Sequence, residues 1–186
     1  MEKIRCAWCE KDDLYRSYHD NEWGKPVYDD KTFFEFLVLE SFQAGLSWYT
    51  ILKRRENFKT AFDGYNYRKI AAYDDVKVEE LMQNSGIIRN RLKILATVNN
   101  ATRFMEVQKE FGTFSEYIWS FVGGKPVVNQ FSELKKVPAT TEISDALAKD
   151  LKKRGFKFLG STVVYAYMQA TGMVNDHVQD CWMRNQ

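Results

Sequence analysis

The sequence predicts an all-α fold, a compact multi-helix domain that spans residues 1–186. Apolar residues recur at helical spacing along most of the chain, and no stretch keeps the two-residue alternation of a half-buried strand. Only three prolines interrupt this pattern. A chain of 186 residues with 45% hydrophobic content can fill one core, so we expect a single domain.

The first half of the chain carries two clear helix signals. Residues 31–43 are apolar nearly all round, as is typical of a buried helix. Ser47 is suited to cap a second helix, which carries apolar residues from Trp48 to Phe62 and ends at Asp63-Gly64. We therefore expect two neighbouring helices separated by a short turn.

The middle of the chain continues the helical pattern. Asp75 is suited to cap a helix that stops at Gly86, and a long amphipathic helix is expected over about 89–105. Thr113 and Glu116 have the spacing of a capping box and predict a further helix start.

The last third predicts two helices joined by a tight turn. Ser144 is expected to begin one helix, which stops at Gly155, and Ser161 or Thr162 to begin another, which ends at Gly172. Glycines bracket the intervening hairpin, 155–160, whose backbone N–H groups could attract a phosphate. Four cations surround it: Lys152, Lys153, Arg154 and Lys157. An ordinary connection between helices with exposed lysines is an equally good interpretation.

Charge alone points to no partner, because a net charge of +2 is less basic than many nucleic-acid-binding proteins. Three cysteines without a dense framework favour a reducing compartment. No apolar stretch reaches a transmembrane length and no signal-peptide pattern is present, so we expect a cytoplasmic protein. Nothing calls for a membrane, a nucleotide cofactor or more than a monomer.

The two histidines of the chain each pair with a cysteine at opposite ends of the sequence. Cys6, His19, His177 and Cys181 form a Cys2His2 set, the ligand types that suit tetrahedral zinc. His177 and Cys181 have the i, i+4 spacing of one helical turn. Four protein ligands leave no open position, which predicts one structural zinc that joins the two ends. Alternatives are that Cys9 replaces Cys6, or that the histidines and buried thiols are incidental.

A zinc that occupies both histidines leaves acid–base chemistry to other groups. Glu40 lies inside the apolar helix, where an unpaired carboxylate is costly, so it is hydrogen-bonded, protonated or functional. With Gln43 and Trp48 it suggests one face of a polar and aromatic pocket. The alternative is that Glu40 points to solvent from the edge of the helix.

Aromatic residues gather around His19, from Trp8 through Tyr15 and Tyr18 to Trp23. If zinc holds this segment against a C-terminal helix, it orders a pocket wall without taking part in the chemistry. Asp20 or Asp176 could accept a hydrogen bond from a ligand imidazole. Core packing is the simpler interpretation for some of these aromatics.

These motifs together resemble the bacterial DNA-3-methyladenine glycosylase I family over essentially the full length of the chain. Ser41 departs from the family pattern, where a glycine often follows the glutamate. The matching segments are Cys6-Ala7-Trp8, YHDNEWG at 18–24, Glu40, QAGLSW at 43–48, GIIRNR at 86–91, Trp119-Ser120-Phe121, KKRGFKF at 152–158 and Val174-Asn175-Asp176-His177.

The resemblance implies a helix-hairpin-helix fold, with that element at about 144–172, and a single zinc. The family's zinc ligands fall on Cys6, His19, His177 and Cys181, which favours Cys6 over Cys9. Its base-recognition residues fall on Glu40, Tyr18 and Trp48, with Trp8 and Trp23 nearby. DNA contacts are expected from Gly45, Leu46, Lys153, Gly155, Lys157 and Gly160.

The implied reaction is excision of 3-methyladenine from double-stranded DNA after base flipping. We expect Glu40 to be the first candidate for activating water and Asp176 the second, with Asn175 where related folds often carry an aspartate. No lysine stands out as a Schiff-base nucleophile, which predicts a monofunctional glycosylase. Rival hypotheses are a non-catalytic lesion-binding protein, a zinc hydrolase of small molecules and an all-α interaction module.

Overall fold

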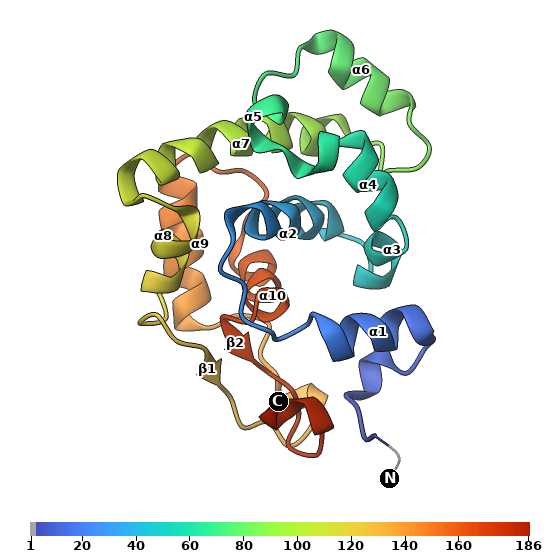
Figure 1. The fold of residues 1–186 in the computed structure, drawn as a ribbon, viewed down its shortest axis with the longest axis vertical. Helices are drawn as coiled ribbons and strands as arrows, with labels where there is room; N and C mark the ends of the chain where they lie inside the picture. Colours follow the sequence, from blue (N-terminus) through green and yellow to red (C-terminus); the bar gives the residue numbers. More distant parts are fainter. Residues whose placement is uncertain (1–2) are drawn as a thin grey trace.

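The computed structural model describes residues 3–186, and helices account for most of this part of the chain (Figure 1). The prediction of a mainly helical fold is confirmed. The α-helices are α1 Asp13–Asn21, α2 Asp30–Gln43, α3 Trp48–Leu52, α4 Arg55–Ala61, α5 Tyr67–Ile70, α6 Asp75–Gln83, α7 Arg91–Phe111, α8 Phe114–Ser120, α9 Glu142–Lys153 and α10 Ser161–Ala170. Short 3-10 helices lie at η1 Ala7–Cys9, η2 Asp63–Tyr65, η3 Leu134–Lys136 and η4 Trp182–Asn185, and two strands at β1 Val127–Val128 and β2 Val174–Asn175.

Helix α2 forms the centre of the molecule, with α7 on one side and α10 on the other (Figure 1). Its residues Phe33, Phe34 and Phe36 to Phe42 are all buried, so the helix has no solvent face along this stretch. A helix that is apolar all round must be covered on every side, and the surrounding helices provide that cover. The predicted buried helix is confirmed.

Several helix caps agree with the sequence, and two are displaced. Thr113 and Glu116 form both halves of the predicted capping box. Asp74, not Asp75, caps α6 by accepting from the Lys77 amide, and Thr141, not Ser144, caps α9. In both places a second residue able to cap lies one or three positions away. The capping residue is the one whose backbone is extended at the chain entry, which the local sequence does not specify.

The single helix expected over residues 48–62 is divided into α3 and α4 at Lys53-Arg54. The Arg54 guanidinium donates to the backbone carbonyls of Ser85 at 3.1 Å and Gly86 at 3.2 Å. These contacts join segments 31 and 32 residues apart. The division therefore accompanies a long-range interaction that the periodicity of residues 48–62 does not report.

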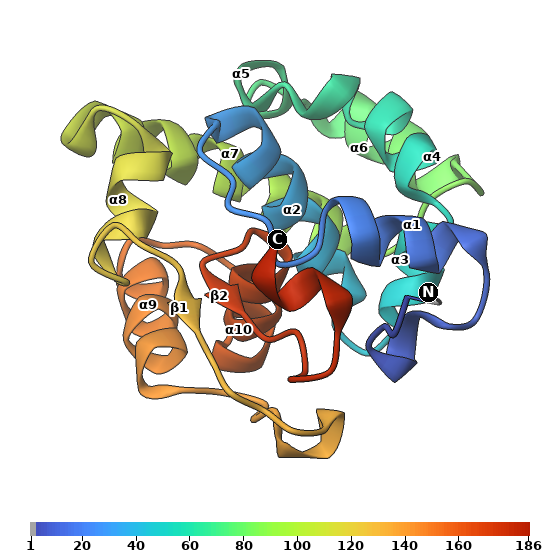
Figure 2. The ribbon, with the colours of Figure 1, turned by 60° about the horizontal axis from the view of Figure 1, so that its bottom comes forward.

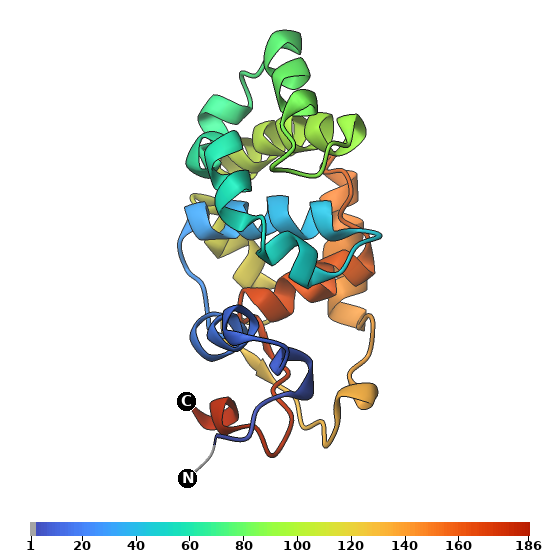
Figure 3. The same cartoon turned by 90° about the vertical axis from the view of Figure 1, so that its right-hand side faces the viewer.

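The two ends of the chain meet at one end of the molecule (Figures 1 and 3). Strand β1 pairs in parallel with β2, aligning Val127 with Val174, and the Trp182 amide donates to the Ile4 carbonyl at 2.9 Å. Figure 2 shows this pair beside α9 and α10. Residues 177–181 form a loop and turn, so the expected helix carrying His177 and Cys181 is wrong. Their convergence comes from the path of that loop.

Within residues 3–186, no helix combines the length and the hydropathy that a membrane crossing requires.

Candidate active site and metal cluster

The four predicted metal ligands come together in the structure, all of them buried. Ligand atoms of Cys6, His19, His177 and Cys181 lie within 4.8 Å of one another. The Cys181 Sγ lies 3.4 Å from His19 Nε2 and 3.5 Å from His177 Nδ1, and Cys6 Sγ lies 3.7 Å from His177 Nδ1. A tetrahedral zinc with bonds of about 2.0–2.3 Å has ligand–ligand edges of roughly 3.3–3.8 Å. The group could hold a metal ion.

Each imidazole has a partner for its second ring nitrogen. His19 Nδ1 lies 2.8 Å from Asp20 Oδ1, and Arg5 binds the same carboxylate through contacts of 2.9–3.1 Å. Although burial alone would raise it, the hydrogen bonds from Arg5 and His19 hold the pKa of Asp20 at about 2. His177 Nε2 lies 3.1 Å from the Trp23 carbonyl oxygen. These partners orient both ligand nitrogens toward the cluster.

Cys9 is buried but lies outside the cluster. Its thiol donates to the Cys6 carbonyl at 3.1 Å.

The Cys181 thiol has a lowered pKa. Its hydrogen bond with Cys6, together with contacts from His177 and His19, lowers this pKa. The same hydrogen bond raises the pKa of the Cys6 thiol, so the pair favours one thiolate, the form that binds metals.

An aromatic layer connects the cluster to a neighbouring cavity. The ring centroid of Trp8 lies 5.4 Å from that of His19 and 5.0 Å from that of Trp23. The Trp23 centroid in turn lies 4.7 Å from that of His177. Both histidines therefore pack directly against the aromatic wall of the cavity.

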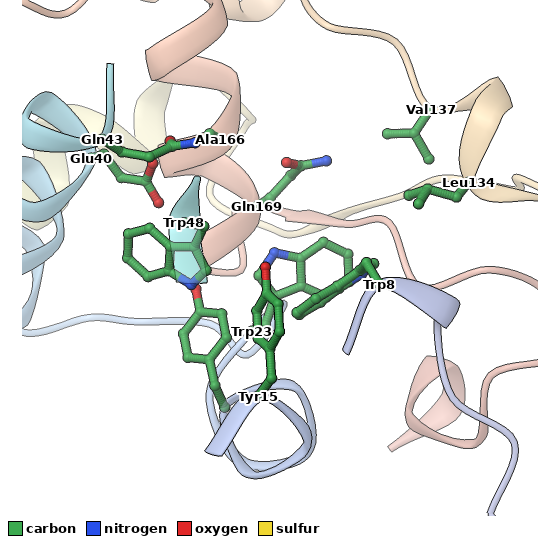
Figure 4. Close-up of a pocket in the computed structure, with 11 residues that line it drawn as sticks. Trp8, Tyr15, Trp23, Glu40, Gln43, Trp48, Leu134, Val137, Ala166 and Gln169 are labelled. Carbon is green, nitrogen blue, oxygen red and sulfur yellow. The ribbon is translucent and has the colours of Figure 1, made fainter. Parts of the chain in front are cut away.

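The cavity lies between this wall and helices α2, α3 and α10 (Figure 4). Its volume is about 210 Å³, below the roughly 300–1,000 Å³ of pockets for drug-sized ligands, which suits one planar ring system. The lining residues are Trp8, Tyr15, Tyr18, Trp23, Glu40, Gln43, Trp48, Leu134, Val137, Ala166 and Gln169. All five residues that we predicted for base recognition line this one cavity.

Glu40 is the carboxylate of the cavity. It is 3% exposed, and its Oε2 has no hydrogen-bond partner among the atoms of residues 3–186. Burial raises the pKa of Glu40 to about 8. The alternative that Glu40 points to solvent is therefore wrong, and an unsatisfied carboxyl oxygen faces a site that a ligand can enter.

Trp48 begins α3 because Ser47 caps that helix, accepting from the Thr50 amide at 3.3 Å. Its ring centroid lies 5.4 Å from that of Tyr18 and 6.3 Å from that of Phe36, which stacks on it. The Trp48 indole Nε1 is buried without a partner within the described part of the chain. Burial holds the pKa of Tyr18 well above its usual value, so this phenol stays neutral.

The sequence did not single out several walls of the cavity. Gln169 and Ala166 reach it from α10, and Leu134 and Val137 from the segment around η3. Gln169 is four residues from Tyr165 on one helix face, a spacing that is visible but carries no functional signal by itself. Leu134 and Val137 lie outside any long helix, and the sequence around them carries no functional signal.

The loop after α2 projects at one side of the cavity. Gly45 has a φ of +83°, and a side chain there would meet nothing within 4 Å. Leu46 is 39% exposed. The buried Lys93 of α7 donates to the carbonyls of Phe42 at 2.8 Å and Ala44 at 2.7 Å, which caps the carboxyl end of α2 and ties down the loop base.

The predicted hairpin is a glycine-bracketed turn between α9 and α10, and it forms no strands. Asn99 of α7 donates to the Gly155 carbonyl at 2.9 Å, and Asn100 bonds both backbone groups of Lys157. Gly155 has a φ of +87°. The turn is thus held by α7, the helix that also holds the loop after α2.

Asp176 differs from its predicted role. It is 1% exposed, does not line the cavity and makes no contact with either ligand imidazole. Its oxygens accept from Asn129 at 2.7 Å, Tyr165 at 2.6 Å and Gln169 at 2.8 Å. This carboxylate is already fully engaged, which argues against it as the group that activates water.

Comparison with known proteins gives consistent matches. The family model described as methyladenine glycosylase matches residues 8–185. DNA-3-methyladenine glycosylase 1 of Escherichia coli strain K12 is 49% identical over 177 residues, covering 95% of each chain. A crystal structure of a 3-methyladenine DNA glycosylase I superposes with a TM-score of 0.94 at 49% identity, covering 96% of this chain and 98% of that one. A structure of the Staphylococcus aureus 3-methyladenine DNA glycosylase I, solved to explain 3-methyladenine recognition, superposes with a TM-score of 0.94 at 38% identity. The match covers 98% of this chain and 97% of that one.

Proposed function

The chain belongs to the methyladenine glycosylase family, and on that premise we propose that its aromatic cavity binds 3-methyladenine flipped out of DNA. The protein is a DNA glycosylase that excises 3-methyladenine. The observation that supports the cavity as its active site is Glu40, a buried carboxyl group whose free oxygen faces an aromatic pocket. We also propose that residues 1–186 act as one domain, as a monomer in the cytoplasm.

The charge of the lesion explains why a buried carboxyl group suits this pocket. Methylation at N3 makes the nucleotide base cationic and weakens its bond to the sugar. A cation beside Glu40 favours the carboxylate form, offsetting the desolvation that raises its pKa to about 8. Trp48 and Trp8 add stacking and cation–π attraction of roughly 0.5–2 kcal/mol. Normal adenine lacks both the charge and the weakened bond.

Bond cleavage removes that charge. As the bond between N9 and C1′ breaks, its electron pair moves into the base, which leaves as neutral 3-methyladenine. Water adds to C1′ and gives its proton to Glu40, the only carboxylate among the described residues that line the cavity. Because Glu40 is now protonated and the base is neutral, the attraction between opposite charges is gone, which favours release of the product.

The products follow from which nucleophiles are available. No lysine is among the residues of the described chain that line the cavity, so no amine is placed to form a Schiff base with the sugar. We infer that the enzyme is monofunctional and leaves an intact strand with an abasic site.

We propose that Cys6, His19, His177 and Cys181 hold one structural zinc. Two thiols, two oriented imidazoles and complete burial support this choice. When bound, the ion supplies a cross-link between the chain ends and no reactive position. Its effect on catalysis is indirect, through the Trp8 and Trp23 wall.

We propose that DNA lies across the loop after α2 and the turn between α9 and α10, a helix-hairpin-helix element. A side chain at Gly45 would meet nothing within 4 Å, and Leu46 is 39% exposed, which suits entry of this loop into the gap left by the flipped nucleotide. Lys153, Gly155, Lys157 and Gly160 border the turn, where cations and backbone amides favour phosphate.

The decisive experiment measures base release from methylated duplex DNA by chromatography, using wild type and Glu40→Gln. We expect free 3-methyladenine and little 7-methylguanine from wild type, and about 100-fold slower release from Glu40→Gln, in the range of losing one charged catalytic contact. The matched control is Glu56→Gln, at a glutamate that is 84% exposed on α4, and it should act like wild type.

Other outcomes have definite meanings. Tight binding to abasic duplex without any release would favour the lesion-binding hypothesis. Equal rates for wild type and Glu40→Gln would remove Glu40 from the chemistry. Cleavage of the DNA strand by the purified enzyme, without added borohydride, would contradict the monofunctional assignment.

A further inference from the structure

We propose that Gln169 selects purines that carry an amino group at position 6, because Asp176 holds the Gln169 amide with its oxygen toward the cavity. The inference rests on the proposed base-binding role of that cavity. It assigns a specificity role to Gln169 and a positioning role to Asp176.

The carboxylate of Asp176 receives three donors. Asn129 Nδ2 donates to Oδ1, and Tyr165 Oη and Gln169 Nε2 both donate to Oδ2. Tyr165 and Gln169 lie four residues apart on α10 and share one helix face. Asn129 follows β1, and Asp176 follows β2, so the parallel pairing of these strands brings them together.

This arrangement determines which end of the Gln169 amide faces the ligand. Carbonyl and amino ends of an amide are similar in shape, so hydrogen bonds must distinguish them. A carboxylate surrounded by donors accepts hydrogen bonds only, which requires the Gln169 amino group to face Asp176. In Figure 4 the amide oxygen lies on the side that carries Glu40, and the nitrogen on the opposite side.

The Gln169 side-chain oxygen is free to accept from a ligand. It takes part in no hydrogen bond recorded within residues 3–186, and it is not among the fully buried unsatisfied atoms, so it is accessible from the cavity. Asp176 is 1% exposed, so a buried partner holds the amide in place before any ligand arrives.

An acceptor in this place discriminates between substituents at position 6. A 6-amino group has two N–H donors, which Gln169 and Glu40 can accept. A 6-oxo group would direct an acceptor oxygen at the Gln169 oxygen, with no proton between them. Mismatched polar groups in a closed site are penalised far more than a missing methylene group.

The test compares the binding of two free bases, 3-methyladenine and 3-methylhypoxanthine, by quenching of tryptophan fluorescence. They differ in carrying an amino or an oxo group at position 6. We expect wild type to prefer the amino form by on the order of 10- to 100-fold. Gln169→Leu removes the acceptor at similar size and should reduce this preference about tenfold.

Asp176→Asn tests the positioning role. Its new amide can donate to the Gln169 oxygen, which would turn the Gln169 amino group toward the cavity. The preference should then shift toward the oxo base, a change that a merely structural loss would not produce. Tyr165→Phe is the matched control: it removes one donor from Asp176, leaves the Gln169 contact in place and should keep the wild-type preference.

The outcomes separate this inference from the function on which it rests. If wild type releases 3-methyladenine from DNA and Gln169→Leu keeps the full amino preference, the inference is overturned and the function stands. If wild type neither binds 3-methyladenine nor releases it, both the Gln169 inference and the proposed function are overturned. Melting curves and metal content of Asp176→Asn establish that it folds, and Gln169→Leu decides the question if it does not.

Discussion

The Cys2His2 cluster and the aromatic cavity are both buried and polar, but their polar atoms are satisfied differently. In the cluster, His19 and His177 have a partner at each ring nitrogen, and the thiols contact the imidazoles. In the cavity, Glu40 Oε2 and Trp48 Nε1 have no partner within the described chain. Unsatisfied buried groups are costly and uncommon. The satisfied contacts of the cluster therefore favour stability, whereas the unsatisfied atoms of the cavity are available to a ligand.

Cys181→Ser should disrupt the Cys2His2 cluster and lower stability more than the other substitutions. Loss of one of four ligands removes or weakens metal binding, and we expect a fall of about 4 kcal/mol or more in the free energy of unfolding. Thermal melting and metal content per chain measure it. Cys9→Ser is the matched control, because Cys9 is buried beside the cluster but is not a ligand. An unchanged melting curve and metal content for Cys181→Ser would refute the proposed structural zinc site.

The buried carboxyl group of Glu40 in the cavity makes the free energy of unfolding depend on pH. Burial raises the pKa of Glu40 to about 8 from 4.5, so the folded state holds a proton that the unfolded state releases between these values. Stability contributed by the protonated group is complete below pH 4.5 and is lost as pH rises toward 8. At about 1.4 kcal/mol per pKa unit, the shift from 4.5 to about 8 sets an upper limit of roughly 5 kcal/mol on this loss.

Glu40→Gln provides the control for this titration, since glutamine cannot ionise. Denaturant unfolding of the ligand-free protein between pH 5 and 9 should show a flatter profile and greater stability than wild type near pH 8. Parallel profiles for the two proteins would mean that Glu40 is not the buried titrating group.

Lys93→Met tests the buried ammonium group that caps the carboxyl end of α2 beside the cavity. The substitution keeps the length of the side chain but removes two hydrogen bonds to the carbonyls at the end of α2. Because removing the cation also relieves its desolvation, we expect a net loss of only about 1–2 kcal/mol. Hydrogen exchange at residues 43–47 should increase. Lys109→Met, at an exposed lysine of the same helix, should change neither quantity.

Trp48→Leu should affect ligand binding and leave the stability of the fold nearly unchanged. Loss of stacking is expected to weaken binding of 3-methyladenine by about 1–2 kcal/mol, with little change in metal content. Trp48→Phe retains a flat ring and should lose less. Equal losses for both substitutions would show that the indole N–H, not the ring face, carries the interaction.

Residue types and local spacing were enough to predict the features that depend on nearby atoms. The capping box at Thr113 and the apolar α2 follow from side-chain chemistry within a few residues, together with the rule that apolar faces are buried. Glu40 could be recognised as unusual for the same reason, because a carboxylate in an apolar helix needs an explanation. The Cys2His2 set was predicted from ligand types alone, since its members lie at opposite ends of the chain.

The tertiary structure alone decided the features that depend on contacts between distant segments. Residues 177–181 bring His177 and Cys181 together as a loop, and Asp176 binds Gln169 and Asn129 instead of a histidine. Hydrogen-bond partners 47 residues apart, such as Asn129 and Asp176, leave no periodic signal in the chain. The sequence thus determined which chemical groups were available, and the packing of helices and strands determined which of them were satisfied and which remained open to a ligand.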